Sequence, residues 1–337
     1  MIPALVLTAG LATRLRPLSF VRAKAALPVA GEPLARRILR RLAAGGVTDA
    51  VLNLHHLPHT LTAVVGDGSD LGVRVRYSWE MPVLGSAGGP RRALSLLGSS
   101  TFLIVNGDTL TDVDVAAVAL AHQRSGALVT MAVVPNTEPD KYGGVLVDAD
   151  GAVTGFTRRS LVPSHHRTAV PSYHFIGVQV AEAEAFASLE DRRPAESVAA
   201  LYPALIAAKA GSVRAHVCDA EFLDIGTPAD YLRTSLLLAR RESHSFRLKP
   251  EATDSGSVAS GSSRKNPARI HPTARVDASI LWDDVEVGAG AMLHECVVTD
   301  GVHVPADTSW TGVTIRTATS ELAPGERRID GLAICSL

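Results

Sequence analysis

The chain of 337 residues carries 33 Lys and Arg against 34 Asp and Glu, a formal net charge of −1, and 46% of its residues are hydrophobic. This length accommodates roughly two domains of ordinary size, and the composition excludes collagen, coiled coils and disordered chains. The balanced charge gives no overall basic surface for nucleic acid, and no apolar run approaches the ~18 residues of a membrane-spanning helix, so we expect a cytoplasmic protein.

Short apolar runs alternate with helical patterns over residues 1–241, which predicts one α/β domain with a doubly wound, mostly parallel sheet. The last helix has the clearest start, because Thr227 can cap it, Pro228 suits its first position and Asp230 lies at its third. The predicted strands are residues 4–7, 50–54, 73–77, 102–105 and 128–134, and the predicted helices are residues 33–45, 89–97, 113–125, 197–209 and 228–241.

A loop of small and cationic residues follows the first predicted strand. Residues 8–14 read TAGLATR, and the loop continues to Lys24. Small residues at the carboxyl end of a parallel strand let backbone N–H groups approach phosphates, and Arg14 and Lys24 can neutralise the charge. The segment matches neither GxxxxGK[ST] nor GxGxxG, so a phosphate-binding loop and an ordinary surface loop both stay open. On the next helix we expect Arg36, Arg37, Arg40 and Arg41 to form a solvated face.

Two aspartates each follow an apolar strand, Asp108 in FLIVNGD and Asp224 in EFLDIGT. Ligands of open α/β sheets collect at the carboxyl ends of the strands. Two carboxylates that converge there can hold Mg²⁺, which prefers oxygen ligands and keeps waters and substrate phosphates in its shell. An aspartate in an NGDT segment also commonly caps a turn, so from the residues alone metal binding and turn capping both stay open.

The pattern changes after residue 241. Residues 242–268 are rich in Gly, Ser and Pro without an apolar period, which predicts a flexible linker. In residues 269–337 small aliphatic residues recur at spacings of five or six, the signature of a hexapeptide-repeat β-helix. They are Ile270, Val276, Leu281, Val287, Leu293, Val298 and Val304. Seven positions amount to about two coils, too few to stand alone, so we expect this tail to lean on the first domain or on a second subunit.

Six motifs in residues 1–241 together resemble the sugar-1-phosphate nucleotidylyltransferase family. They are VLTAGLATRLRPL with AKAALPVAGEPL, then LGSAGG, VNGD, KYGGV, GFTRR and FLDIGTPADYL, in the order usual for that family. The resemblance implies a Rossmann-like sheet of the nucleotide-diphospho-sugar transferase type, followed by a short left-handed parallel β-helix. LGSAGG is similar to the LGTAG form of mannose-1-phosphate guanylyltransferases, which favours GTP as the nucleotide.

The resemblance also implies roles for individual residues. Arg14, Lys24 and Asp108 would be catalytic, and Asp108 with Asp224 would hold Mg²⁺. Ala9, Gly10, Leu11, Ala12, Thr13 and Gly88 would bind the nucleoside triphosphate, with backbone groups of Gly10, Leu11 and Gly88 cradling it. Tyr142, Gly143, Arg159 and Gly177 would bind the sugar 1-phosphate. Because two multiply charged phosphates must meet, catalysis would consist mainly of positioning and charge neutralisation.

Four departures from the family pattern bear on these roles. Ala12 stands where glycine is usual, and an alanine keeps the backbone only if its φ stays negative. Ala23 and Ala25 replace the prolines that flank the lysine, which we expect to loosen its orientation. Arg158 and Arg159 replace a Glu-Lys pair; an arginine at 159 can still grip phosphate, but Arg158 removes an acceptor for sugar hydroxyls. Of the segment Tyr173 to Val178, only Gly177 is kept.

Several alternatives remain open. UTP or dTTP with glucose 1-phosphate or an amino-sugar 1-phosphate would use the same chemistry. A non-catalytic regulator would bind a nucleotide sugar without making it, and a scaffold would act through a tail that assembles a homo-oligomer. We set zinc aside: Pro58 breaks the helical pairing of His55, His56 and His59, and the cysteines Cys218, Cys296 and Cys335 lack ligand spacing.

Overall fold

The computed structural model describes residues 2–157, 172–246, 259–260 and 267–337, and the chain divides into two compact units. The first unit contains Met1–Gly10, Ile38–His56 and Val65–Leu223, and the second contains Leu11–Arg37, Leu57–Val64 and Asp224–Leu337. The cationic loop therefore shares a unit with the C-terminal tail. The predicted boundaries at residues 241 and 268 follow chain order and stay predictions. No helix in the part of the chain that the structure describes is long and apolar enough to cross a membrane.

A nine-stranded mixed sheet forms the centre of the first unit, and it confirms the α/β fold class. The order β10-β9-β11-β6-β1-β4-β5 continues from β11 through β8 to β12. Its strands are β1 (Ala4–Leu7), β4 (Asp49–Leu54), β5 (Arg74–Trp79), β6 (Thr101–Asn106), β8 (Val129–Pro135), β9 (Gly144–Val147), β10 (Val153–Thr157), β11 (Tyr173–Glu182) and β12 (Val213–Val217). The neighbours β5, β4, β1 and β6 are parallel, whereas β11 runs antiparallel to β6 and β8.

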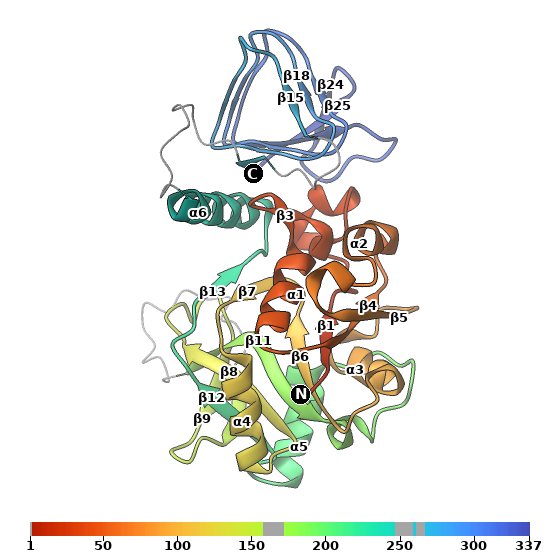
Figure 1. The fold of residues 1–337 in the computed structure, drawn as a ribbon, viewed down its shortest axis with the longest axis vertical. Helices are drawn as coiled ribbons and strands as arrows, with labels where there is room; N and C mark the ends of the chain where they lie inside the picture. The colour runs from red at the N-terminus through yellow and green to blue at the C-terminus, as the bar shows by residue number, and fades with distance from the viewer. Residues whose placement is uncertain (1, 158–171, 247–258, 261–266) are drawn as a thin grey trace. The chain divides into compact units, whose positions relative to one another are not determined.

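Helices pack on this sheet (Figure 1). α3 (Gly85–Leu97) contacts β1, β4 and β5, α4 (Val115–Ser125) contacts β8 and β11, and α5 (Tyr202–Ala208) contacts β10 and β12. Leu5, Phe102 and Tyr202 are fully buried in the resulting core. The predicted helices are thus confirmed, although α3 starts four residues early and a π-helical turn, Ser197–Leu201, precedes α5.

The expected solvated face of four arginines is confirmed for Arg40 and Arg41 and wrong for Arg36 and Arg37. α1 (Leu34–Ala44) forms as predicted, but Arg36 and Arg37 are half-buried rather than solvated. The guanidinium of Arg37 donates to the carbonyl of Val29 at 2.6 Å and pairs with Glu242, and the Arg36 guanidinium donates to a backbone carbonyl. The expected break in the helical pairing of His55, His56 and His59 is confirmed. α2 (Pro58–Val65) starts at Pro58, because proline is tolerated at a first helical position, and it contains only His59.

The cationic loop folds into three short 3₁₀ turns and a hairpin within the second unit. The turns are η1 (Thr13–Leu15), η2 (Leu18–Phe20) and η3 (Lys24–Ala26), and the hairpin pairs β2 (Pro28–Val29) with β3 (Glu32–Pro33). In the same unit α6 (Pro228–Phe246) begins as predicted, because the N–H of Asp230 donates to Thr227 Oγ1 at 3.1 Å.

The tail is a parallel β-helix of three sheets, and Figure 1 shows its triangular outline. Arg269 pairs with Glu286, which pairs with His303, so equivalent residues recur every 17 positions. The strands are β15 (Arg269–Ile270), β16 (Arg275–Asp277), β17 (Ile280–Leu281), β18 (Glu286–Val287), β19 (Met292–His294), β20 (Val297–Val298), β21 (His303–Val304), β22 (Ser309–Thr311) and β23 (Val313–Thr317).

The tail has more coils than the two that we expected, because the nine strands β15 to β23 make three turns. The half-buried Trp310 and the buried Ile315 extend the series beyond Val304, the last repeat position that we predicted. The antiparallel strands β24 (Arg327–Ile329) and β25 (Leu332–Ser336) close the sheet that holds β23, while β14 (Ala259–Ser260) lies at its other edge. Within its unit the tail contacts residues 11–37, so the expected packing against the N-terminal part of the chain is confirmed.

Candidate active site

The start of the cationic loop and the loop that bears Asp108 leave neighbouring strands at the same end. β1 pairs in parallel with β6, with Leu7 opposite Asn106. The N–H of Gly107 then donates to the carbonyl of Leu7 at 2.9 Å. A Cβ at Gly107 would lie 2.5 Å from that carbonyl oxygen, so only glycine permits this crossing. The crossing brings Gly107, the residue before Asp108, next to Thr8, the first residue after β1.

Gly177 lies at the same place in the sheet. Val178 of β11 pairs with Val105 of β6, and the ladder between β11 and β8 shifts register between Phe175 and Gln179. Gly177 has a φ of +78°, and a Cβ there would lie 2.9 Å from Cβ of Asn106. The structure thus brings two of the predicted residues, Asp108 and Gly177, to either side of the end of β6. Asp108 itself is half-buried, and its carboxylate accepts a hydrogen bond from Thr109 Oγ1 at 3.2 Å.

A buried polar network that we did not predict fixes the backbone after β1. The side-chain oxygen of Asn53 accepts hydrogen bonds from the N–H groups of Thr8, at 2.5 Å, and Ala9, at 3.2 Å. Its amide nitrogen donates to Glu80 Oε1 at 2.6 Å, and Glu80 Oε2 accepts the N–H of Leu84 at 2.8 Å. Asn53 and Glu80 are 3% and 4% exposed. The available signal was a polar residue inside or directly after an apolar strand, in VLNL and YSWE.

The LGSAGG motif forms the first turn of α3, and protein groups satisfy its amides. Glu196 Oε2 accepts the hydroxyl of Ser86 at 2.6 Å, and the carbonyl of Ala195 accepts the N–H groups of Ala87 and Gly88. A Cβ at Gly88 would lie 2.5 Å from the carbonyl oxygen of Arg193. Packing against residues 193–195 therefore accounts for glycine at position 88. Because its N–H is already donated, the predicted contact of Gly88 with a nucleotide would have to use another of its atoms.

Gly10 differs from Gly88. It is exposed, and no described atom lies within 4 Å of a Cβ built at this position. The preceding Ala9 is buried, with its N–H held by Asn53. The backbone after β1 is therefore fixed on its inner side and open at Gly10, which is the arrangement that a phosphate-binding backbone needs.

An aromatic cluster surrounds the predicted sugar-binding residues Tyr142 and Gly143. The rings of Tyr142 and His174 lie 4.2 Å apart, and Phe222 packs edge-on against both, with centroids at 5.4 and 4.6 Å. Burial lowers the pKa of His174 to about 4, against the opposing charge of Glu138, so its ring is neutral at physiological pH. The predicted residue Arg159 and its neighbour Arg158 lie outside the described residues.

In the second unit, the loop that follows Gly10 is held in a conformation that we did not expect. Ala12 has φ 48° and ψ 43°, so the condition stated above for an alanine at this position, a negative φ, is not met. Its carbonyl accepts hydrogen bonds from Ser19 Oγ at 2.9 Å and from the N–H of Leu15 at 3.0 Å, and these bonds hold the left-handed conformation. Three residues predicted to face a nucleotide, Leu11, Thr13 and Arg14, are exposed.

Lys24 starts the turn η3. We expected the alanines on either side of it to loosen the backbone here, but both are packed in the interior. Ala23 and Ala25 are only 2% and 1% exposed. The N–H of Ala23 donates to Thr60 Oγ1 at 3.0 Å, and that hydroxyl donates to the carbonyl of Leu57, the residue before α2. A proline at position 23 has no N–H, so the alanine makes a contact that the usual residue cannot make. Side-chain packing and this hydrogen bond together replace the rigidity of the prolines.

Asp224 is half-buried at the end of β13 (Phe222–Asp224), the strand at which the two units meet in the sequence. Its backbone carbonyl accepts the hydroxyl of Thr234 at 3.2 Å. The described residues contain no group of three or more His, Cys, Asp or Glu that could hold a metal ion. Asp108 belongs to the first unit and Asp224 to the second, so their joint hold on Mg²⁺ stays a prediction. Each carboxylate by itself is a ligand type that suits Mg²⁺, which is commonly bound by one or two carboxylates with waters and substrate phosphates completing its shell.

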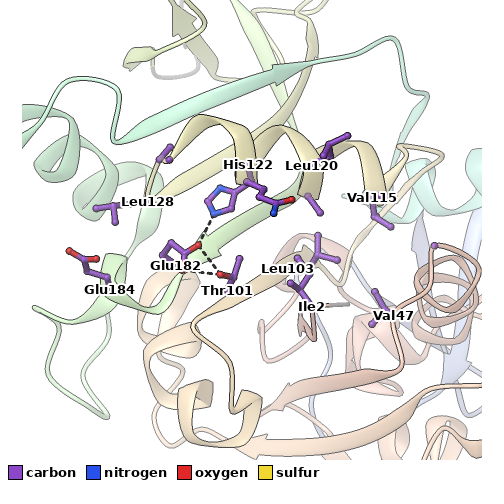
Figure 2. Close-up of a pocket in the computed structure, with 16 residues that line it drawn as sticks. Ile2, Val47, Thr101, Leu103, Val115, Leu120, His122, Leu128, Glu182 and Glu184 are labelled. Carbon is purple, nitrogen blue, oxygen red and sulfur yellow. Dashed lines mark hydrogen bonds and ion pairs between the residues drawn. The ribbon is translucent and has the colours of Figure 1, made fainter.

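A separate cavity lies within the first unit, at the opposite end of the strands (Figure 2). Its volume is about 780 Å³. His122 pairs with Glu182 at 3.1 Å, and the hydroxyl of Thr101 donates to the same carboxylate at 2.8 Å. Thr101 begins β6, whereas Asp108 follows its end, and six residues of strand span ~20 Å. This cavity is therefore not the predicted substrate site. Its apolar lining includes Ile2, Val47, Leu103, Val115, Leu120 and Leu128.

Family models of known proteins match both the N-terminal part and the C-terminal tail of the chain. A family model described as nucleotidyl transferase matches residues 3–241, and one described as GlmU-like, C-terminal hexapeptide matches residues 250–316. The mannose-1-phosphate guanylyltransferase of Mycobacterium tuberculosis is 29% identical over 303 residues, covering 87% of this chain and 83% of that protein. The N-acetylmuramate alpha-1-phosphate uridylyltransferase of Neisseria meningitidis is 46% identical over 116 residues, 34% of this chain and 50% of that protein.

A similar fold occurs among solved structures. The crystal structure of HddC from Yersinia pseudotuberculosis superposes with a TM-score of 0.60 at 20% identity, covering 71% of this chain and all of that one. The first family model spans well over half of the chain. The chain therefore belongs to the nucleotidyl transferase family and is a sugar-1-phosphate nucleotidylyltransferase with a C-terminal hexapeptide-repeat tail.

Proposed function

We propose that this enzyme transfers the guanylyl group of GTP to mannose 1-phosphate, forming GDP-mannose and releasing pyrophosphate. One observation carries the proposal: the loop after β1 and the loop bearing Asp108 leave adjacent parallel strands at the same end. The choice of GTP and mannose rests on the LGSAGG motif and on the similarity to the Mycobacterium tuberculosis enzyme along most of the chain. The Neisseria meningitidis relative makes UTP with an amino-sugar phosphate the second candidate.

In this mechanism a phosphate oxygen of the sugar 1-phosphate attacks the α-phosphorus of the nucleotide in line. The bond to the β-phosphate breaks, and pyrophosphate leaves with its electron pair. The exposed backbone at Gly10 approaches the nucleotide phosphates, Arg14 neutralises the triphosphate, and Lys24 bridges the phosphates of the two substrates. Asp108 and Asp224 are the residues that would hold Mg²⁺, which supplies further charge neutralisation at the phosphoryl oxygens. Tyr142, Gly143, Arg159 and Gly177 are assigned to the sugar phosphate.

A substrate panel tests the proposal directly. The protein is incubated with Mg²⁺, each of the four nucleoside triphosphates and several sugar 1-phosphates, and pyrophosphate release is measured. We expect the highest kcat/KM for GTP with mannose 1-phosphate. Turnover only with UTP or dTTP would select the alternative substrates. Tight binding of a nucleotide sugar without turnover of any pair would instead identify a non-catalytic regulator.

Substitution of Asp108 tests the role of the carboxylate. Asp108→Asn should lower kcat by roughly 100-fold or more, because it removes a charge that holds the cation against the reacting phosphates. The matched control is Asp150→Asn, an exposed carboxylate in the turn between β9 and β10, which should leave kcat unchanged. Equal activity of the two variants would exclude Asp108 from the reaction.

A further inference from the structure

The tail holds one arginine of the cationic loop through a buried ion pair. Arg22 is 7% exposed. Its Nε donates to Asp300 Oδ2 at 2.7 Å and its Nη2 donates to Asp300 Oδ1 at 2.5 Å, while Nη2 also donates to Asp283 Oδ2 at 2.6 Å. The guanidinium lies 5.3 Å from the ring centroid of Trp282. Both carboxylates belong to the β-helix. More than 250 positions of chain separate them from the arginine with which they form ion pairs.

The tail contacts α6 at one point and the cationic loop at one further point. Trp282 is fully buried and donates its Nε1–H to the hydroxyl of Tyr231 at 3.0 Å, and that hydroxyl donates to the carbonyl of Pro28. On the other side of Arg22, the guanidinium of Arg316 lies 5.3 Å from the ring centroid of Phe20. Side chains of the tail therefore contact the loop directly at Phe20 and Arg22, and they reach Pro28 through Tyr231 of α6.

The bidentate geometry fixes the orientation of Arg22 as well as its position. Only Ala23 separates Arg22 from Lys24, and the N–H of Ala23 is itself bound by Thr60. Both the side chain before the lysine and the peptide group beside it are thus immobilised. A lysine that bridges phosphates must be held within a fraction of an ångström of its working position, because small misplacements cost large factors in rate.

We propose that Asp300 and Asp283 are positioning residues for the transfer reaction: through Arg22 they set the phosphate-bridging Lys24, so the hexapeptide tail is a working part of the active site. This inference rests on the proposed function of Lys24. It makes the tail more than an assembly device, and it assigns to the ion pair the orienting role that prolines usually have at this lysine.

The ion pair is poorly explained as a stabilising contact alone. Burial raises the pKa of Asp300 despite the opposing charge of Arg22 and its hydrogen bonds, so keeping this carboxylate ionised has a free-energy cost. The pKa of Arg22 is raised, because the two carboxylates together outweigh the burial that lowers it. Because Asp283 still pairs with Arg22 when Asp300 is neutralised, we expect such a variant to fold.

The test compares neutral substitutions in the full-length protein. Asp300→Asn and Asp283→Asn each remove one carboxylate from Arg22, and Asp300→Glu keeps the charge. The matched control is Asp277→Asn on the same tail, where the carboxylate pairs with His294 at 2.8 Å and is exposed. Each variant is assayed for kcat and for the KM of both substrates, with far-UV circular dichroism and the thermal midpoint as measures of folding.

We expect Asp300→Asn to lower kcat/KM for the nucleotide by about tenfold or more with unchanged circular dichroism. Asp283→Asn should have a smaller effect in the same direction, Asp300→Glu should recover most of the activity, and Asp277→Asn should match the wild type. A folded Asp300→Asn with kcat/KM within about twofold of wild type overturns the proposal. If Asp300→Asn does not fold, the kcat/KM of Asp283→Asn is compared with the wild type instead. A value within about twofold of the wild type then overturns the proposal. A wild-type protein without activity on any substrate pair would refute the proposed function instead.

Discussion

His174 is the side chain whose protonation we expect to couple most clearly to folding. It is packed between Tyr142 and Phe222, and burial lowers its pKa to about 4 from an ordinary value near 6.5. The unfolded chain therefore takes up a proton at this position before the folded chain does as the pH falls. The free energy of unfolding should decrease between pH ~6.5 and pH ~4 for this reason alone.

Substitution of His174 by phenylalanine keeps a ring in the cluster and removes the titration. The wild type should lose on the order of 1 kcal/mol more stability than His174→Phe between pH ~7 and pH ~5, after allowance for partial exposure to solvent. Urea unfolding at the two pH values measures the difference. An identical loss in both proteins would show that His174 does not titrate in this range.

Single residues also mark where the sequence could not predict the site. Asp108, Gly177 and Gly10 could be placed from motif order, because strand ends and glycine requirements are local properties. Asn53 and Glu80 could not, since their roles come from pairing between β4, β5 and the loop after β1. The conformation of Ala12 depends on Ser19, seven positions away, whose hydroxyl supplies the bond that holds the left-handed turn.

Strand β11 packs against the end of β6 through Gly177, and substitution of this glycine tests whether the contact matters for activity. Gly177→Ala combines a positive φ with a Cβ only 2.9 Å from Asn106. Asn106 must move away from the added Cβ. Because Asn106 ends β6, we expect the turn that follows it, which carries Asp108, to move with it. We expect kcat to fall by about tenfold or more in the pyrophosphate assay, because the carboxylate leaves its working position.

Gly98→Ala is the control for this substitution. Gly98 has a φ of +63° at the end of α3, and no described atom lies within 4 Å of an added Cβ. Both variants have a cost of about 1–2 kcal/mol for the left-handed alanine, but only Gly177→Ala meets a neighbour. Similar loss of stability with unequal loss of activity supports the role of β11, whereas equal activity would contradict it.

Among the secondary-structure elements, the predicted helices and the strands β1, β4, β5, β6 and β8 were found because apolar runs and periodicity mark them. β9, β10 and β12 were missed because Gly, Thr, Arg or His residues interrupt their short apolar runs, and α2 was not predicted. β11 was missed because a glycine and a register shift interrupt its pattern. The third coil of the tail was missed because Trp310 occupies a position that small aliphatic residues fill elsewhere.

The whole chain behaves as one enzyme only if the tail is required for activity, and truncation tests this. A protein ending at residue 246 would expose Tyr231, which is fully buried, and would leave Arg22 without its two carboxylates. An uncompensated buried charge and an uncovered aromatic ring are both strongly destabilising. We expect a lower thermal midpoint and a loss of kcat/KM of about tenfold or more.

Differential scanning fluorimetry and the pyrophosphate assay measure the two effects, and size-exclusion chromatography of both proteins shows whether an oligomer depends on the tail. A truncated protein with full activity and an unchanged midpoint would restrict the tail to assembly. The sequence predicted the existence of the β-helix but not its ion pairs with the cationic loop. No sequence motif or spacing links Arg22 to Asp283 and Asp300.

The 17-residue register of the β-helix limits how this protein can change in length. Each coil places its buried aliphatic side chains above those of the coil before it, as Leu281, Val298 and Ile315 do. Duplication of one coil would preserve that column of side chains. It would move Asp283 or Asp300 along the β-helix by the height of one coil. An insertion of any other size would turn the column outward and separate the two aspartates. Natural variants of this architecture should therefore gain or lose entire coils on the side away from these aspartates.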